Sequence, residues 1–386
     1  MSEEMKNLNE QPAEAPAVEK KPLDKKTIGI IAGVAAAVVV LAIILIVALG
    51  GNSTPAGPVL NDYTLGMGIV TGFENGAAQV NSTVATVVLD KDGKIVACRL
   101  DAVQAKATLN TDGTFAIANL KTKMELGDAY GMAAAVNYGM DWNNDGVVKE
   151  WYDQAKAFEA HVVGMTAAEV EAMGTQEVPG KGYIISNDEE LLAAGCTIQI
   201  GEFKEAVVKA CNDEFKVSFK SEGNFTLGVA VDTYDSESTV ATAEGEGALQ
   251  LYSDFAASVV EGGKIVASLN DAIQPKITFN VNGEITGTSF KATKRELKGE
   301  YGMAAAVNYG MDWNNDGVVK EWYEQSAAFS AHVVGMTAEQ VAGMGTQEVP
   351  GKGYIISNDE ALLSAGCTIQ ITSIKTVVAE SVNNAR

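Results

Sequence analysis

The stretch YGMAAAVNYGMDWNNDGVVKEWY at residues 130–152 occurs a second time, without a single change, at residues 301–323. GTQEVPGKGYIISNDE at 174–189 is likewise repeated at 345–360. The offset is 171 residues, and the segments before each copy match more loosely. A unit of about 150 residues is a domain rather than a solenoid repeat. The sequence therefore predicts two tandem homologous domains, 63–212 and 225–383, joined by a bridging stretch near 211–224.

Each unit begins with strand patterns and continues with helical ones. STVATVVLD (82–90) and GKIVACRL (93–100) contain alternating β-formers around a KDG turn, which predicts a hairpin. Farther on, Trp151, Ala155, Phe158 and Val162 recur at helical spacing and predict one buried helix face. Thr166 and Glu169 have the spacing of a capping box. Strands followed by helices predict the α+β fold class for each domain.

The composition is acidic, with a formal net charge of -22 and an isoelectric point near 4.5. Nucleic-acid partners select for a basic face, so this charge argues against them. An acidic surface keeps an exposed protein soluble, and it also suits contact with divalent cations. The hydrophobic fraction of 47% is that of a globular protein, although one apolar run supplies part of it.

That run is TIGIIAGVAAAVVVLAIILIVAL at residues 27–49, which is uncharged and long enough to cross a bilayer as a helix. Lysines lie before it and none follows directly, which predicts a cytoplasmic N-terminus and repeats outside the cell membrane. We therefore predict a cytoplasmic disordered tail (1–26), a single-pass transmembrane signal-anchor (27–49), a linker (50–62) and extracellular domains at the cell surface. A cleaved secretory signal ending near Ala48 and Gly50 is the alternative.

The repeated acidic stretch resembles the first half of an EF-hand or dockerin calcium loop. Counted from Asp141, oxygen-bearing side chains fall at positions 1, 3 and 5, and Gly146 at position 6 permits a sharp turn. Position 12 is Tyr152 rather than glutamate, so Glu150 is the candidate to close a shorter loop. An Asx-rich turn at a helix start is the alternative. The predicted calcium ligands are Asp141, Asn143, Asp145, Val147 (backbone carbonyl), Glu150, Asp312, Asn314, Asp316, Val318 and Glu321.

The chain also resembles the FMN-binding domain family of extracytoplasmic flavoproteins. The hairpin VVLDKDGKIVACRLD and the ending LLAAGCTIQIGEFKEAVVKA carry this resemblance. In that family a threonine holds FMN through a phosphoester, and the resemblance places this cofactor at two matching triplets. The family's Asp and Ser are replaced by Leu191 and Ala194 in the first copy. The triplets are Gly195, Cys196 and Thr197, and Gly366, Cys367 and Thr368.

The remaining reactive side chains form no recognisable catalytic pattern. The two histidines, His161 and His332, occupy matching places and are assigned to packing or to a helix dipole. The four cysteines do not pair consistently between the copies, which predicts free buried thiols, and a Cys98–Cys196 or Cys98–Cys211 disulfide is the alternative. We predict a non-enzymatic surface or binding module with FMN-binding-like domains and calcium loops. The alternative is an FMN-carrying electron-transfer protein with an unknown redox partner.

Overall fold

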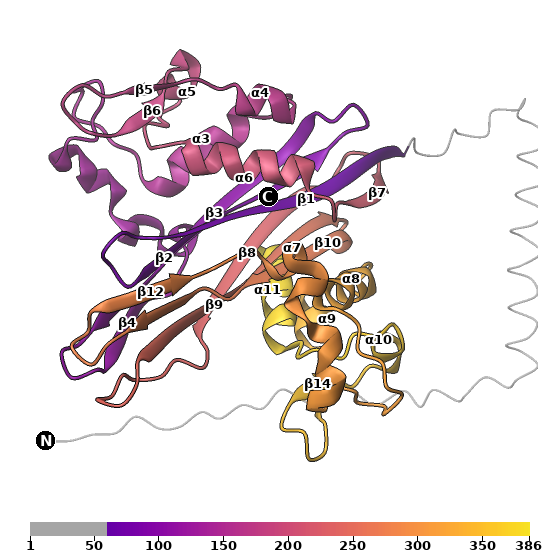
Figure 1. Cartoon of the computed structure of the whole chain (residues 1–386). Helices are drawn as coiled ribbons and strands as arrows, with labels where there is room; N and C mark the ends of the chain where they lie inside the picture. The colour runs from indigo at the N-terminus through magenta and orange to yellow at the C-terminus, as the bar shows by residue number, and fades with distance from the viewer. Residues whose placement is uncertain (1–59) are drawn as a thin grey trace, which may run out of the picture. The chain divides into compact units, whose positions relative to one another are not determined.

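The computed structural model describes residues 60–386, which form one compact unit (Figure 1). The first repeat opens with a four-stranded antiparallel meander, and β7 from the bridging stretch adds a fifth strand beside β1. The KDG turn joins β2 to β3, so the predicted hairpin is confirmed. The strands are β1 (Asn61–Phe73), β2 (Gln79–Leu89), β3 (Ile95–Leu109), β4 (Phe115–Asn119) and β7 (Val217–Ser221).

The helical half of the first repeat covers one face of this sheet. The predicted stripe is confirmed, because Trp151, Ala155, Phe158 and Val162 are all buried. Thr166 and Glu169 form the predicted capping box. The elements are α2 (Lys123–Leu126), η1 (Gly127–Tyr130), η2 (Met132–Tyr138), α3 (Trp151–His161), α4 (Ala167–Glu171), β5 (Thr175–Glu177), β6 (Ile184–Ser186), α5 (Glu189–Ala193) and α6 (Gly201–Asn212).

The second repeat has the same plan with one strand interrupted. Pro275 stands where the first repeat has Ala105, and it separates β10 from β11, because proline has no N–H for the ladder. The strands are β8 (Thr226–Asp235), β9 (Gly247–Glu261), β10 (Lys264–Ile273), β11 (Lys276–Phe279) and β12 (Ile285–Ser289). The remaining elements are α7 (Lys294–Leu297), η3 (Lys298–Tyr301), η4 (Met303–Tyr309), α8 (Trp322–His332), α9 (Ala338–Ala342), β13 (Thr346–Glu348), β14 (Ile355–Ser357), α10 (Glu360–Ser364) and α11 (Thr372–Asn383).

The two repeats share a hydrophobic core between their sheets. Leu65 and Val84 of the first sheet belong to the same buried cluster as Leu227 and Phe255 of the second. On the outer faces α6 packs on β1 and β2, and α11 packs on β8 and β9. Gly66 permits this close approach, because a Cβ there would collide with a backbone carbonyl of α6. The order of layers is helices, sheet, sheet, helices.

This arrangement corrects two parts of the predicted fold class and localisation. The predicted tandem domains are not independent globules, since their sheets bury each other. The predicted anchor at 27–49 lies outside the described residues, and within 60–386 no helix is both long and apolar enough to cross a bilayer. The transmembrane helix, the signal-anchor, the membrane partner and the single-pass, extracellular, cell-surface location therefore have no structural support, and we withdraw them.

Candidate functional site

The acidic loop of each repeat is a turn closed by its own carboxylates. Asp141 accepts hydrogen bonds from the backbone N–H groups of Asp145 (3.1 Å) and Gly146 (2.7 Å). Asp145 accepts from the N–H of Val147 at 2.8 Å and from the Asn143 amide at 2.9 Å. Gly146 has a φ of 80°, in the left-handed region that glycine adopts readily. The second repeat forms the same turn, with Asp312 bonded to Asp316 and Gly317.

The proposed closing ligand of the calcium loop lies elsewhere. Glu150 accepts the N–H groups of Met132 (2.8 Å) and Ala133 (3.1 Å), so its carboxylate satisfies the start of η2. Glu321 does the same for η4 in the second repeat. Within residues 60–386 no group of three His, Cys, Asp or Glu side chains is placed to hold a metal ion. The predicted calcium binding is accordingly unsupported, and an Asx-rich turn describes the loop.

The second predicted site, the triplet Gly195–Thr197, forms a tight turn before α6. Gly195 has a φ of 90°, which a residue with a side chain rarely adopts. The backbone N–H of Thr197 donates to Oε1 of Gln154 at 2.8 Å, and its hydroxyl lies 3.3 Å from the same atom. Gln154 is fully buried and also donates to the carbonyl of Lys149. The threonine hydroxyl is therefore buried and already bonded, as it is in Thr368 with Gln325.

Cys196 and Cys367 are structural rather than reactive. Both thiols are fully buried, and burial raises the pKa of each to about 12. A thiol protonated at neutral pH is a poor nucleophile and a poor redox group. All four cysteines are free and buried, which confirms the prediction of unpaired thiols. His161 and His332 lie 3.5 and 3.4 Å from Asp188 and Asp359, at the C-terminal ends of α3 and α8.

The structure brings the two predicted sites together, which the sequence did not reveal. Nζ of Lys149 donates to the carbonyl of Ala194 at 2.8 Å, so the end of the acidic loop lies across the glycine turn. A cavity of about 490 Å³ lies between them. Lys320 and Ala365 form the same contact in the second repeat, at 2.9 Å. The cavity is lined by Trp142, Asn143, Asp145, Val147, Lys149, Glu189, Leu192, Ala193, Gly195 and Thr197.

Sequence reasoning missed a lysine in the first turn after each meander. Nζ of Lys123 lies 5.0 and 5.3 Å from the ring centroids of Tyr130 and Trp151, at a cavity of about 330 Å³ beside the start of α6. Burial lowers the pKa of Lys123 to about 8. Tyr130 and Trp151 lie within the exact repeat, and Lys123 matches Lys294 at the same offset. A lysine that recurs in both repeats together with two aromatic residues was the sequence signal that could have revealed this site.

The comparisons with known proteins give one relative of low similarity. A protein named chlorophenol reductase, from Desulfitobacterium hafniense, is 27% identical over 178 residues, which cover 40% of this chain and 51% of the relative. The chain thus spans about half the length of the curated relative that it matches. No model of a protein family matches the chain, and no solved structure is significantly similar to it.

This relative corrects the prediction that the chain is not an enzyme. A protein named as a reductase is 27% identical to this chain over the aligned residues, and this similarity points toward an enzyme. The non-enzymatic assignment is therefore abandoned.

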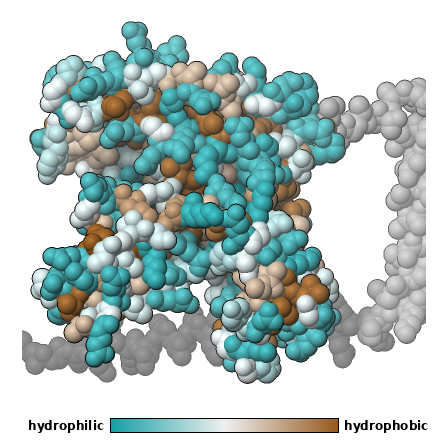
Figure 2. All heavy atoms as spheres, in the orientation of Figure 1, coloured by the Kyte–Doolittle hydropathy of each residue, from teal (hydrophilic) through white to brown (hydrophobic). Residues whose placement is uncertain are grey.

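The side of the molecule seen in Figure 2 is mainly hydrophilic, and its hydrophobic residues are scattered. This side therefore shows no extended apolar docking face.

Proposed function

We propose that the chain is a redox protein of the reductase type in which the repeats bind FMN without a covalent bond. The observation that carries this proposal is the cavity in which the acidic loop and the Gly-Cys-Thr turn meet. Its volume of about 490 Å³ lies in the usual range of small-molecule sites. The similarity to a protein named as a reductase supports a redox role.

The side chains of this cavity suit a noncovalent flavin better than an esterified one. Trp142 offers an indole face for a planar ring system, and Lys149 offers the positive charge for a phosphate. The Thr197 hydroxyl is buried and donates to Gln154, so it is poorly accessible for a phosphoester. The carboxylate of Asp145 is engaged by Val147 and Asn143, which reduces its repulsion of an anion.

The protein's part in such a reaction is to bind and orient. FMN, when bound, supplies one- and two-electron transfer, which the side chains here cannot perform themselves. The hydrogen bond to the carbonyl of Ala194 positions Lys149, and the hydrogen bond from the Thr197 N–H to Gln154 fixes the glycine turn.

A spectroscopic titration of the full chain with FMN tests the proposal. Binding should quench flavin fluorescence and leave a yellow protein after gel filtration, with no added mass once the protein is denatured. Lys149→Met combined with Lys320→Met should weaken binding about tenfold, the effect of one lost charge-assisted contact. Lys156→Met is the matched control, since this exposed lysine of α3 lies outside the cavity.

Two results would contradict the proposal. Protein that stays colourless at saturating FMN would exclude a flavin site. Flavin mass that survives denaturation, and that Thr197→Ala with Thr368→Ala abolishes, would show covalent attachment instead.

A further inference from the structure

In each repeat, the residues that follow the closing helix contact the other repeat. Phe215 follows α6 and Arg386 follows α11, and the repeat offset of 171 residues relates them. The guanidinium of Arg386 donates to both carboxylate oxygens of Glu159, at 2.8 and 2.9 Å, in the first repeat. The ring of Phe215 lies 5.2 Å from the Arg295 guanidinium carbon and 5.8 Å from the ring of Tyr323, in the second repeat.

The surfaces that receive these two tails differ in size and charge. Glu159 has Ser330 as its counterpart, and Arg99 has Leu269. In the first repeat Arg99, Glu159 and Arg386 fill the junction with one buried carboxylate and two cations. In the second repeat the smaller side chains leave a cavity of about 280 Å³ beneath Phe215. Its lining includes Phe215, Leu269, Arg295, Tyr323, Ser330 and Val334.

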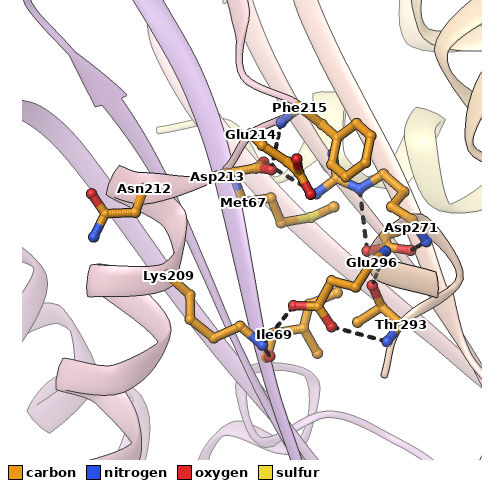
Figure 3. A pocket seen from close by; sticks show the side chains of 11 residues that line it. Met67, Ile69, Lys209, Asn212, Asp213, Glu214, Phe215, Asp271, Thr293 and Glu296 are labelled. Carbon is orange, nitrogen blue, oxygen red and sulfur yellow. Dashed lines mark hydrogen bonds and ion pairs between the residues drawn. The ribbon is translucent and has the colours of Figure 1, made fainter. Parts of the chain in front are cut away.

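Arg295 lines this mainly apolar cavity and is held by two carboxylates. The residue is only 5% exposed. Nη2 donates to Asp213, Nε lies 3.2 Å from Asp271, and Nη1 is buried without a hydrogen-bond partner among residues 60–386. Figure 3 shows Asp213, Phe215 and Asp271 gathered in the adjoining pocket. Because Nε and Nη1 have almost no accessible surface, Arg295 contributes its charge to the cavity but no free hydrogen bond to a ligand.

Ser330 provides a hydrogen-bond donor in the lining of the cavity. Its Oγ accepts from the Asn270 amide at 2.8 Å, and its own hydrogen has no partner among residues 60–386. The charge of Arg295 is already matched by Asp213 and Asp271 at 3.2 Å each, which disfavours a ligand with a full negative charge. A cavity of about 150 Å³ can hold benzene, so this larger one accommodates a substituted ring.

We propose that this cavity is a binding site for an uncharged, single-ring aromatic molecule with one oxygen substituent, such as a phenol. The ring packs against Phe215, Tyr323 and Leu269, and the oxygen accepts from the Ser330 hydroxyl. The site is independent of the proposed FMN cavity, because the two share no lining residue. The first repeat has no equivalent space at this junction, since Arg386 and Glu159 occupy it.

Calorimetric titration of the full chain with phenol tests the site. Phenol should bind at one site per chain, and benzoate should bind at least tenfold more weakly because its charge is unmatched. Ser330→Glu introduces the residue of the first repeat and should weaken phenol binding at least tenfold. Ala327→Phe alters the exposed rim of the same cavity and should have the same effect, even if Ser330→Glu fails to fold.

Ser364→Glu is the matched control, because it makes the same change on the exposed face of α10. Phenol affinity should be unchanged in this variant and in the presence of saturating FMN. The proposal is overturned if phenol does not bind, if benzoate binds as tightly as phenol, or if Ala327→Phe leaves phenol affinity unchanged. Competition between FMN and phenol would also overturn it, by placing both in one cavity.

Discussion

The two repeats place different charges at matching buried positions. In the first, Asp101 is buried beside Met124, whereas in the second the matching Asp271 lies beside Arg295. Lys123 lies near the exposed Glu202 and one buried carboxylate, Asp101, while its counterpart Lys294 lies near two buried carboxylates, Asp254 and Asp271. Duplicated backbones therefore tolerate different charge sets, provided that each buried charge is matched or neutralised.

The repeats also differ in how accessible this lysine is, Lys123 in the first and Lys294 in the second. Lys294 lies within 5.3 Å of the ring centroids of Tyr252, Tyr301 and Trp322. Tyr252 stacks on Tyr234 at 5.7 Å, and these two tyrosines correspond to Asn81 and Gly72 in the first repeat. The smaller residues leave Lys123 at an open cavity, which makes the first repeat the more accessible of the two.

The largest effect should follow from Arg295→Met, which gives the second repeat the residue of the first. The change leaves Asp213 and Asp271 buried without their cation, and breaking a buried pair costs about 3–5 kcal/mol. We expect a loss near the top of that range in the free energy of unfolding, measured with urea at pH 8. Met124→Leu, the control at the matching position, should cost less than about 1.5 kcal/mol. Equal losses would mean that the ion pairs do not distinguish the repeats.

The next effect compares Lys294→Met with Lys123→Met. Removal of Lys294 leaves Asp254, which is only 4% exposed, without its nearby cation, so we expect a loss of about 3 kcal/mol. Removal of Lys123 leaves the exposed Glu202 and one buried carboxylate, Asp101, which accepts a proton readily because burial raises its pKa to about 7. We therefore expect a smaller loss, of about 1–2 kcal/mol. Urea unfolding of both variants at pH 8 measures the difference. A Lys123→Met variant that is as unstable as Lys294→Met would refute the assignment of partners.

A smaller effect concerns the pH dependence of stability. Burial raises the pKa of Asp101 to about 7, above its unfolded value of about 3.9. The folded protein then binds more protons than the unfolded chain between these values, so stability falls as pH rises from about 4 to about 7. Asp101→Asn can still accept from the N–H groups of Ala102 and Met124 and should remove this part of the slope. The free energy of unfolding, measured at several pH values between about 4 and about 7, tests this prediction. Asp92→Asn, at an exposed carboxylate, is the control.

The smallest expected effect is that of calcium on the acidic loops. Because Glu150 and Glu321 already bind the starts of η2 and η4, any site here lacks a closing ligand and should be weak. Millimolar calcium should therefore leave the melting temperature within about one degree of its metal-free value, because ligand stabilisation grows only as RT ln(1 + [L]/Kd). Asp141→Ala with Asp312→Ala should respond to calcium in the same way. A larger shift that this double variant abolishes would contradict the assignment of the loop as a turn.

The sequence predicted the local features of this fold well because their signals are local. The KDG hairpin follows from alternation around a turn, and the capping box follows from the spacing of Thr166 and Glu169. Both candidate sites were recognised as separate motifs. Their junction was not, because Lys149 and Ala194 are 45 residues apart and meet only when α3 and α5 pack.

The sequence by itself determined the duplication and the order of strands and helices, because these depend on periodicity and near neighbours. The tertiary structure decided that two sheets share one core, that Glu150 turns toward η2, and that the loop and the turn form one cavity. It also decided that Phe215 and Arg386 meet unlike surfaces. These outcomes depend on contacts between residues far apart in the chain, and side-chain direction at such contacts follows from packing rather than from spacing.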